Sequence, residues 1–230
     1  MSKPVPAAQA SPDFDVTTAR RYFSSFADDY HRAFHGTGRD PLHALLNRLF
    51  RRKTFQMRTH VVESLLRAHA VSGKQVLDLG CGSGEVSLLA AGMGANVTGF
   101  DIVPAMVELA RRDAQAAGMA GRTRFEVRDV YTGEVPPSDV TLIVAVIEYY
   151  KEISSFLQRV AGGTRELLIV VDTRGPWWRR MLRYGLARYK RFHLYYRSPD
   201  EVSAAIVAAG FVEESRTLGH SYSVLAFRRV

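Results

Sequence analysis

The spacing of hydrophobic positions changes near residue 74. In residues 16–34 and 42–70, apolar side chains recur every three or four positions, which is the period of one helix face. The stretch "HGTGRDP" separates these two segments with turn-forming residues. We therefore predict a helical region over residues 16–70, ahead of the first strand.

After residue 74, short runs rich in β-branched residues alternate with segments of helical spacing. The runs are "QVLDLG", "NVTGFD", "TRFEVRD", "DVTLIVAV" and "ELLIVVD". The segments between them, residues 85–93, 104–117 and 153–161, are predicted helices. Such alternation is typical of βαβ units, so we expect an α/β fold with a mostly parallel sheet.

The last 35 residues predict one further helix and a hairpin. The stretch "SPDEVSAAIVAAGF" reads as a capped helix that ends at Gly210, with Ser198 or Asp200 as the cap and Glu201 in the first turn. The runs "VEESRT" and "YSVLAFRR", separated by "LGHS", are expected to pair as antiparallel strands at the sheet edge.

Composition indicates a soluble globular protein, with 47% hydrophobic and 23% charged residues. No apolar run reaches the roughly 18 to 20 residues needed to cross a bilayer. Residues 1–15 are rich in Ala, Pro and Ser and lack the apolar core of a secretory signal, so we expect a disordered tail and a cytoplasmic protein. Residues 16–230 are expected to form a single domain.

Charge and cysteine content add two limits. The formal net charge of +8 favours an anionic partner: nucleic acid, a membrane surface or an acidic small molecule. The single cysteine, Cys81, has no partner for an internal disulfide and lies in a glycine-rich turn, so we interpret it as a packing residue.

The stretch "VLDLGCGSGEVSL", residues 76–88, runs from a strand through three glycines into a helix. Glycines let the backbone approach a ligand closely, and the helix start offers free N–H groups. Asp101 and Asp129 end the next two strand runs, where an open α/β sheet binds its ligand. There they suit ribose hydroxyls and an adenine amino group. Asp78 would repel a pyrophosphate but attract a cation.

In order and spacing, these stretches resemble the motifs of the class I S-adenosylmethionine-dependent methyltransferases: "VLDLGCGSG", "VTGFDIVPAM", "FEVRDV" and "DVTLIVAVIEYY". The resemblance covers roughly residue 65 to the C-terminus. It implies a Rossmann-like, seven-stranded, mostly parallel sheet with an antiparallel C-terminal hairpin. It also implies S-adenosylmethionine as methyl donor and S-adenosylhomocysteine as product. No metal ion is expected.

The same resemblance assigns donor contacts. Gly80, Gly82 and Gly84 are expected to line the methionine and ribose, and Asp101 to accept the ribose hydroxyls. Asp78 is expected to support the methionine ammonium, directly or through water.

At the adenine, Ile102 and Met106 are expected to flank the ring, and Asp129, followed by Val130, to meet its amino edge.

The N-terminal stretch "RRYFSSFADDYHRAF" resembles a lid helix of small-molecule members, including those that act on quinone precursors and on magnesium protoporphyrin. Tyr22 and Tyr30 lie eight residues apart on one predicted helix face, so both are expected to close over the donor. Ordinary core packing of these aromatic residues is the alternative. We therefore interpret residues 16–70 as a helical lid region.

Residues after the fourth strand run are candidates for the acceptor side. Methyl transfer is an in-line displacement, and a base helps only with hydroxyl or protonated amine acceptors. Tyr149 is the predicted substrate contact, while Glu148 is an alternative that would touch the donor side. His220, in the predicted hairpin turn, is a candidate base, with solvent exposure as the alternative.

Residues 174–197, "RGPWWRRMLRYGLARYKRFHLYYR", form an insertion that interleaves arginines with aromatic residues. Such a segment suits an interfacial helix on anionic lipid or a mouth for an acidic substrate. A helix whose aromatic residues simply pack on the sheet is the third reading.

The preferred function is methylation of a small-molecule acceptor, on oxygen rather than nitrogen, with an anionic or membrane-proximal acceptor. Peripheral contact with the inner face of an anionic membrane is part of this expectation. A nucleic-acid methyltransferase is the runner-up. The chain lacks an N-P-P-Y type tetrapeptide after the fourth strand run, so no nucleic acid is expected. A non-catalytic scaffold that binds the donor is the third alternative.

Overall fold

A computed structural model describes residues 53–174, 177, 180–181, 184–185 and 194–230. The expectations for residues 1–52, including the tail and a lid helix with Tyr22 and Tyr30, lie outside the described residues. So does most of the insertion.

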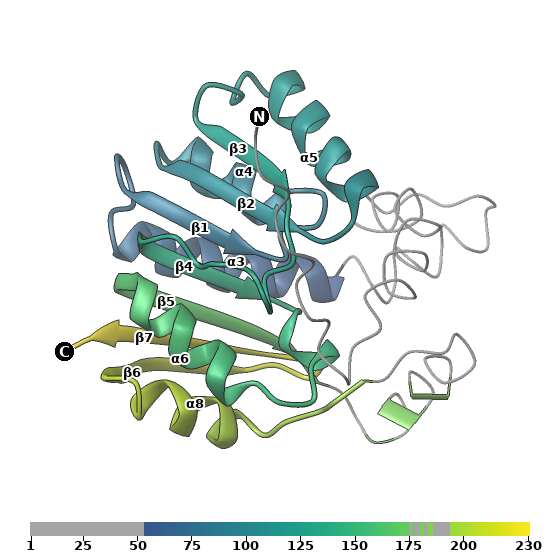
Figure 1. The fold of residues 1–230 in the computed structure, drawn as a ribbon, viewed down its shortest axis with the longest axis vertical. Coiled ribbons are helices and arrows are strands. Elements are labelled where there is room, and N and C mark those ends of the chain that lie inside the picture. Colours follow the sequence, from purple (N-terminus) through teal and green to yellow (C-terminus); the bar gives the residue numbers. More distant parts are fainter. Residues whose placement is uncertain (1–52, 175–176, 178–179, 182–183, 186–193) are drawn as a thin grey trace, which may run out of the picture.

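The core is one seven-stranded sheet in the order β3-β2-β1-β4-β5-β7-β6 (Figure 1). Its strands are β1 (Gln75–Leu79), β2 (Asn96–Asp101), β3 (Thr123–Val127), β4 (Ser138–Val144), β5 (Thr164–Thr173), β6 (Phe211–Leu218) and β7 (Tyr222–Arg229). The first five are parallel, and β7 runs antiparallel to both β5 and β6. The predicted fold class, including the antiparallel hairpin, is confirmed.

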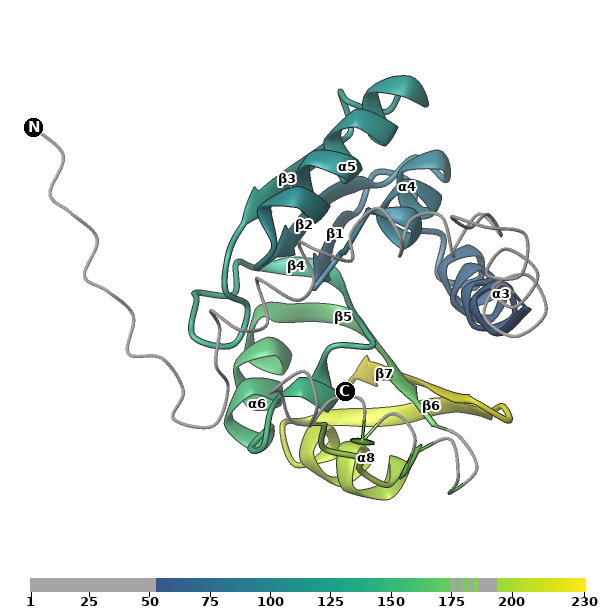
Figure 2. The same ribbon diagram turned by 90° about the vertical axis from the view of Figure 1, so that its right-hand side faces the viewer.

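Helices cover both faces of the sheet (Figure 2). One face carries α3 (Lys53–Ala68), α4 (Glu85–Gly92) and α5 (Pro104–Ala116), and the other carries α6 (Ser154–Gly163) and α8 (Pro199–Val207). The helix α3 belongs to the region predicted as a lid. It packs on β7 and α4, in the layer that covers the sheet.

Continuous apolar runs form the central strands because both faces of these strands are buried. In β4, Leu142 packs with α3 and α4, while the next residue, Ile143, packs with α6 and α8. Both side chains are fully covered, and each such burial contributes about 1.5 to 3 kcal/mol. Because successive side chains of a strand point to opposite faces of the sheet, β4 contributes to the cores on both faces.

The start of α8 distinguishes between the two predicted caps. The Ser198 hydroxyl accepts the Glu201 N–H at 3.1 Å, and the Glu201 carboxylate accepts the Ser198 N–H at 2.7 Å. This reciprocal capping box makes Ser198 the cap, not Asp200.

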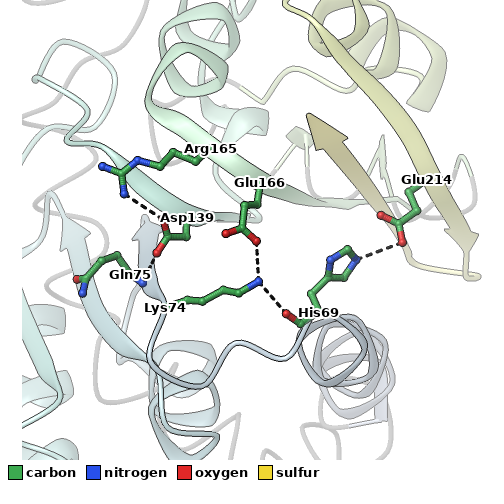
Figure 3. A network of polar contacts seen from close by, with 7 residues as sticks. All are labelled: His69, Lys74, Gln75, Asp139, Arg165, Glu166 and Glu214. Atoms are coloured by element: carbon green, nitrogen blue, oxygen red, sulfur yellow. Dashed lines mark hydrogen bonds and ion pairs between the residues drawn. The ribbon is translucent and has the colours of Figure 1, made fainter. Parts of the chain in front are cut away.

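Charged side chains join the starts of the strands at the amino edge of the sheet (Figure 3). Lys74 donates to the His69 carbonyl at 2.9 Å and to Glu166 at 2.6 Å. His69 contacts Glu214 of β6 at 3.1 Å. These contacts tie the end of α3 to β5 and β6.

Next to them, Asp139 accepts the Gln75 N–H at 2.9 Å and an Arg165 N–H at 3.0 Å. The Gln75 N–H, and then the Arg165 guanidinium, lower the pKa of Asp139.

The opposite, carboxyl edge of the sheet gathers the ends of β1 to β5 and the turn between β6 and β7. Register places that turn here, since Tyr222 of β7 pairs with Thr173, the last residue of β5. The Arg174 N–H also donates to the Ser221 carbonyl at 2.9 Å.

Two loops of this edge, after β1 and after β4, touch at Gly80. A Cβ on Gly80 would lie 2.2 Å from Cγ2 of Val146, far inside van der Waals contact. Gly80 also has φ +77°, in the left-handed region that favours glycine. Ala145, just before Val146, has φ +56°, a conformation that costs a non-glycine residue about 1 to 3 kcal/mol. The two loops are therefore fitted closely to each other.

We expect Gly80→Ala to destabilise the fold more than Gly118→Ala. Gly118 has a similar φ, +69°, but a Cβ there would meet no atom within 4 Å. Both variants incur the cost of an alanine in the left-handed region, about 1 to 2 kcal/mol, and Gly80→Ala adds an overpacking cost of about 1 to 3 kcal/mol. Urea unfolding measures both free energies. Equal losses would contradict the close contact with Val146.

Candidate functional site

The glycine turn after β1 is anchored to β2. The N–H groups of Gly80 and Cys81 both donate to the Phe100 carbonyl, at 2.7 and 2.9 Å. Gly84, with φ +85°, precedes the first turn of α4, and a Cβ there would press on Ala110 and Phe125 at 3.0 and 3.2 Å. Gly80 and Gly84 are thus glycines for packing reasons, whatever they line.

Gly82 differs from the other two. Its φ of +55° favours glycine, yet a Cβ there would meet no atom within 4 Å. The turn is therefore open on this side, and Gly82 presents bare backbone to whatever binds there.

Asp101, at the end of β2, holds this turn from the other side. Its Oδ2 accepts the Gly82 N–H at 2.9 Å, and its Oδ1 accepts the Val103 N–H at 2.9 Å. Burial raises the pKa of Asp101, while these backbone donors lower it. A third backbone donor, Ile102, also lowers this pKa. A carboxylate accepts about four hydrogen bonds, so acceptor capacity remains for a hydroxyl group of a ligand.

Asp78, in β1, is the most unusual group of the site. Its side chain is 1% exposed, and Oδ2 accepts the Ser87 hydroxyl of α4 at 2.6 Å. The other oxygen, Oδ1, is buried without a hydrogen-bond partner. Burial raises the pKa of Asp78 to about 7, helped by the charges of Asp101 and Glu85. An unpaired buried carboxylate is costly, so this oxygen calls for a cationic partner.

The turn is thus locally acidic in a chain of net charge +8. Asp78, Asp101 and Glu85 are near enough to act on one another electrostatically, and Glu85 also accepts the Ser83 hydroxyl at 2.5 Å. A ligand with positive charge fits this surrounding, and a pyrophosphate does not.

The predicted adenine residues lie around the ends of β2 and β3. Asp129, partly buried, accepts the Tyr131 N–H at 2.9 Å, and Val130 is buried. Ile102 is partly buried, whereas Met106 is 3% exposed and packs with other α5 residues. The structure brings all four to the same edge as Asp101. Their predicted contacts with adenine stay predictions.

Cys81 is buried in the turn, packed with Phe125 and residues of α5. Burial raises the pKa of its thiol. Both observations fit the expected packing role.

The loop after β4 holds the acceptor-side candidates on a short 3₁₀ helix, η2 (Ile147–Tyr149). Tyr149 is partly exposed, while Glu148 is 1% exposed. Tyr150 is buried and stacks on Tyr131 at 4.3 Å between ring centroids. Burial raises the pKa of Tyr150, which argues against its use as a base.

Sequence reasoning missed the residues that brace this loop. Arg197 donates to several carbonyls of residues 147–151, and Tyr131 donates from its hydroxyl to the Glu152 carbonyl at 2.8 Å. Ser87, which bonds Asp78, was also missed. The sequence neighbours of Asp78 are both leucines, so they do not indicate a hydrogen-bond partner. The fold alone brings Ser87, nine positions later, against the Asp78 carboxylate.

His220 lies in the exposed turn between β6 and β7, at the same edge of the sheet. The strand order places β5 and β7 between β4 and β6, so His220 belongs to the far side of the site. Its role as a base stays a prediction.

Three of the described residues of the insertion present large apolar side chains to solvent. Trp177, Met181 and Tyr184 are helical, and their exposed fractions are 76%, 62% and 40%. They are four and three positions apart in the sequence, and we call these three exposed side chains the stripe. Arg180 is exposed and lies over the Tyr196 ring at 4.7 Å.

Two absences among the described residues concern membranes and metal ions. None of the described helices combines the length and apolar character that crossing a bilayer demands. Within the same residues, His, Cys, Asp and Glu nowhere gather in threes around a possible metal site.

Known proteins with similar sequences are methyltransferases. Residues 76–166 match the family described as a methyltransferase domain. A ubiquinone biosynthesis O-methyltransferase of Methylocella silvestris is 32% identical over 38% of this chain and 34% of its own length. Another, of Chelativorans sp., is 27% identical over 70% of this chain and 67% of its own length. The chain thus spans about a third of the first relative and two thirds of the second.

Solved structures with the same fold extend over nearly the whole chain. Magnesium protoporphyrin IX methyltransferase from Synechocystis PCC 6803, with bound S-adenosylhomocysteine, superposes with a TM-score of 0.77. It is 22% identical and covers 94% of this chain and 99% of its own. The predicted resemblance is confirmed: residues 76–166 match the methyltransferase domain family, and the chain has the fold of the magnesium protoporphyrin IX methyltransferase.

Proposed function

We propose that this chain transfers the methyl group of S-adenosylmethionine to an oxygen atom of a small acceptor. The observation that carries the proposal is the buried, unpartnered Oδ1 of Asp78, in the strand that leads into the glycine turn with its open residue, Gly82. A buried carboxylate oxygen suits a donor with an ammonium group, and Asp101 is proposed to accept the ribose hydroxyls of this donor. When bound, the donor supplies a methyl group on a positively charged sulfur.

In this scheme the residues of the chain bind the donor and orient the acceptor toward it. Asp78 balances the ammonium charge, and Asp101 holds the ribose while it keeps the glycine turn in shape. Tyr149 positions the acceptor so that its oxygen attacks the methyl carbon in line. The new C–O bond forms as the C–S bond breaks and sulfur keeps the electron pair. His220 is the proposed acceptor of the hydroxyl proton.

The choice of oxygen rests on the similar sequences, whose names describe O-methyltransferases of ubiquinone biosynthesis. The test is a donor-turnover screen in which S-adenosylhomocysteine is measured with phenols, porphyrins, glycans and lipids as acceptors. The phenols include 3,4-dihydroxybenzoate and its uncharged counterpart, catechol. A chain that binds the donor but forms product with none of these classes would be a non-catalytic scaffold.

We propose further that the acceptor is anionic or lies at a membrane. Charge and the exposed stripe of Trp177, Met181 and Tyr184, beside Arg180, support this. Aromatic and aliphatic side chains with neighbouring arginines suit the headgroup region of anionic lipid. Such a protein would work from the cytoplasm, at the inner face of the membrane.

We expect the wild-type chain to bind S-adenosylmethionine and S-adenosylhomocysteine in a one-to-one ratio. Asp101→Ala should weaken binding by about 1.5 to 3 kcal/mol, the cost of losing hydrogen bonds to a charged group. Asp139→Ala is the matched control, because it removes a carboxylate that accepts a backbone N–H at the opposite edge. Titration calorimetry measures all three proteins. If the folded wild type binds neither compound, the proposed donor site is wrong.

Donor binding should tighten as pH rises from about 6 to 7.5. Asp78, with its pKa raised to about 7, must lose a proton to pair with the ammonium. The ammonium itself stays charged up to about pH 7.7 to 8.0. The dissociation constant should fall by up to about tenfold per pH unit below the pKa of Asp78. The Asp78→Asn variant should bind the donor more weakly, and its dissociation constant should hardly change with pH. A flat wild-type profile would contradict the role of Asp78.

Without donor, Asp78→Asn should be more stable than the wild type at pH 8. Because the folded pKa of Asp78 lies above the unfolded value of 3.8, its contribution favours folding at low pH and is lost as pH rises through about 7. Removing the charge should recover roughly 2 to 4 kcal/mol at pH 8 and little at pH 4. Urea unfolding at the two pH values measures this. If Asp78→Asn were less stable than wild type at both pH values, burial of the Asp78 charge would not destabilise the fold.

Wild-type protein should co-sediment with vesicles that contain phosphatidylglycerol and not with pure phosphatidylcholine vesicles. The double variant Trp177→Ser, Met181→Ser should stay in solution, because it removes two exposed members of the stripe. The control, Val212→Ser with Leu218→Ser, removes exposed apolar residues of β6, 42% and 53% exposed, and should still sediment. Equal sedimentation of both double variants would rule out the stripe as the contact.

A further inference from the structure

Arg197 is the last arginine of the insertion, yet its guanidinium is turned inward. It is half-buried and donates to the carbonyls of four residues. These are Ile147 at 3.0 Å, Tyr150 at 2.5 Å, Lys151 at 2.6 Å and Tyr195 at 3.4 Å. Three of the four carbonyls belong to the loop after β4.

The backbone beside Arg197 makes a further contact with the same loop. The Tyr195 N–H donates to the Glu148 carbonyl at 2.8 Å. We call these contacts of Tyr195 and Arg197 with residues 147–151 the clasp. It joins two segments about 50 positions apart in the sequence.

The chemistry of the clasp explains why an arginine is used. The last carbonyls of a short helix have no partner within the helix, so they need outside donors. A guanidinium offers five N–H donors in one rigid plane and keeps its charge even where burial lowers its pKa. Hydrogen bonds to a charged donor are also the stronger kind. One side chain thereby satisfies carbonyls before and after Tyr149.

The other end of the loop after β4 is held by the glycine turn after β1, residues 80–84, which we call the donor turn under the proposed function. Val146 lies against Gly80, and Ala145 is held in the left-handed region. Tyr149 lies between this contact and the clasp. Its own N–H donates to the Val146 carbonyl at 3.2 Å. The backbone of Tyr149 is thus held on both sides.

We propose that Arg197 is a positioning residue, which holds Tyr149 in the place where the acceptor binds. This inference rests on the proposed function for the identity of the acceptor side. Arg197 acts through the backbone of residues 147–151 and contacts neither donor nor acceptor. Its loss should therefore loosen the acceptor side and spare the donor site.

A matched control exists on the opposite edge of the sheet. Arg229 also donates to backbone carbonyls, those of Thr164, at 2.9 Å, and Ala161. It lies over the Phe211 ring at 4.9 Å. Arg229→Gln thus removes a carbonyl-binding arginine of the same kind, far from the strand ends that carry the site.

The first experiment is hydrogen exchange on the full chain, with Arg197→Gln compared with Arg229→Gln. Arg197→Gln should speed exchange of the Tyr149, Tyr150 and Tyr195 amides at least tenfold. The amides of the donor turn, residues 80–84, should change less than threefold. Arg229→Gln should leave both groups unchanged. Unchanged exchange at Tyr149 in Arg197→Gln would overturn the proposal, whether or not an acceptor is turned over.

The second experiment measures turnover of 3,4-dihydroxybenzoate and binding of S-adenosylhomocysteine. In Arg197→Gln, kcat should fall at least tenfold while the Kd of S-adenosylhomocysteine stays within threefold of wild type. Arg229→Gln should keep kcat within threefold of wild type, even if its Tm falls as far as that of Arg197→Gln. Arg197→Lys, which keeps charge but has three donors, should recover part of kcat, and it replaces Arg197→Gln if that variant fails to fold. Equal kcat in the Arg197 and Arg229 variants would overturn the positioning role. If the wild type turns over no acceptor, the proposed function fails, and the exchange experiment still decides the clasp.

Discussion

The contact between Gly80 and Val146 is the constraint on which the arrangement of the site depends. Parallel strands β1 and β4 are neighbours, so the loops that leave their carboxyl ends compete for the same space. A missing Cβ on one loop and a left-handed alanine on the other let both turn at once. The glycine turn and the loop after β4 are consequently in direct contact.

Negative charge gathers at one place on this edge of the sheet, although the net charge of the chain is +8. Asp78, Glu85 and Asp101 are near enough to act on one another electrostatically. Such a site would attract a cationic ligand, and the proposed methyl donor is cationic. The buried Asp78 has a cost in the free protein that binding of this donor would offset, which would link affinity to stability.

Most of the fold could be predicted because its determinants are local. Alternating strand and helix spacing, the glycine turn and the acidic ends of two strands can all be read within short windows, and so can the Ser198 cap, as one of two options. The positions of Asp78 and Asp101 at one edge then follow from the topology of parallel strands. Bounds of the elements differ from the expected ones by only a few residues, as in β4, which ends at Val144 where a left-handed alanine breaks it.

The interactions that could not be predicted join residues far apart in the sequence. Nothing near Arg197 marks it as different from the other arginines of the insertion, since its partners are carbonyls about 50 positions earlier. Backbone carbonyls leave no trace in a sequence pattern. The stacking of Tyr131 on Tyr150 and the packing reason for Gly80 and Gly84 are hidden for the same reason.

The two ends of the insertion have a consequence for how such a chain can change. Arg174 is tied to the β6–β7 turn, and Arg197 is tied to the loop after β4, so the scaffold determines the gap between them and not the path that bridges it. The entropy of closing a loop grows only logarithmically with its length, by about 0.6 kcal/mol for each doubling. Between Arg174 and the buried Leu194, a change of length alone would therefore cost little in loop-closure free energy. Under the proposed function, exchange of this part would change acceptor preference and leave the sheet, the glycine turn and the clasp intact.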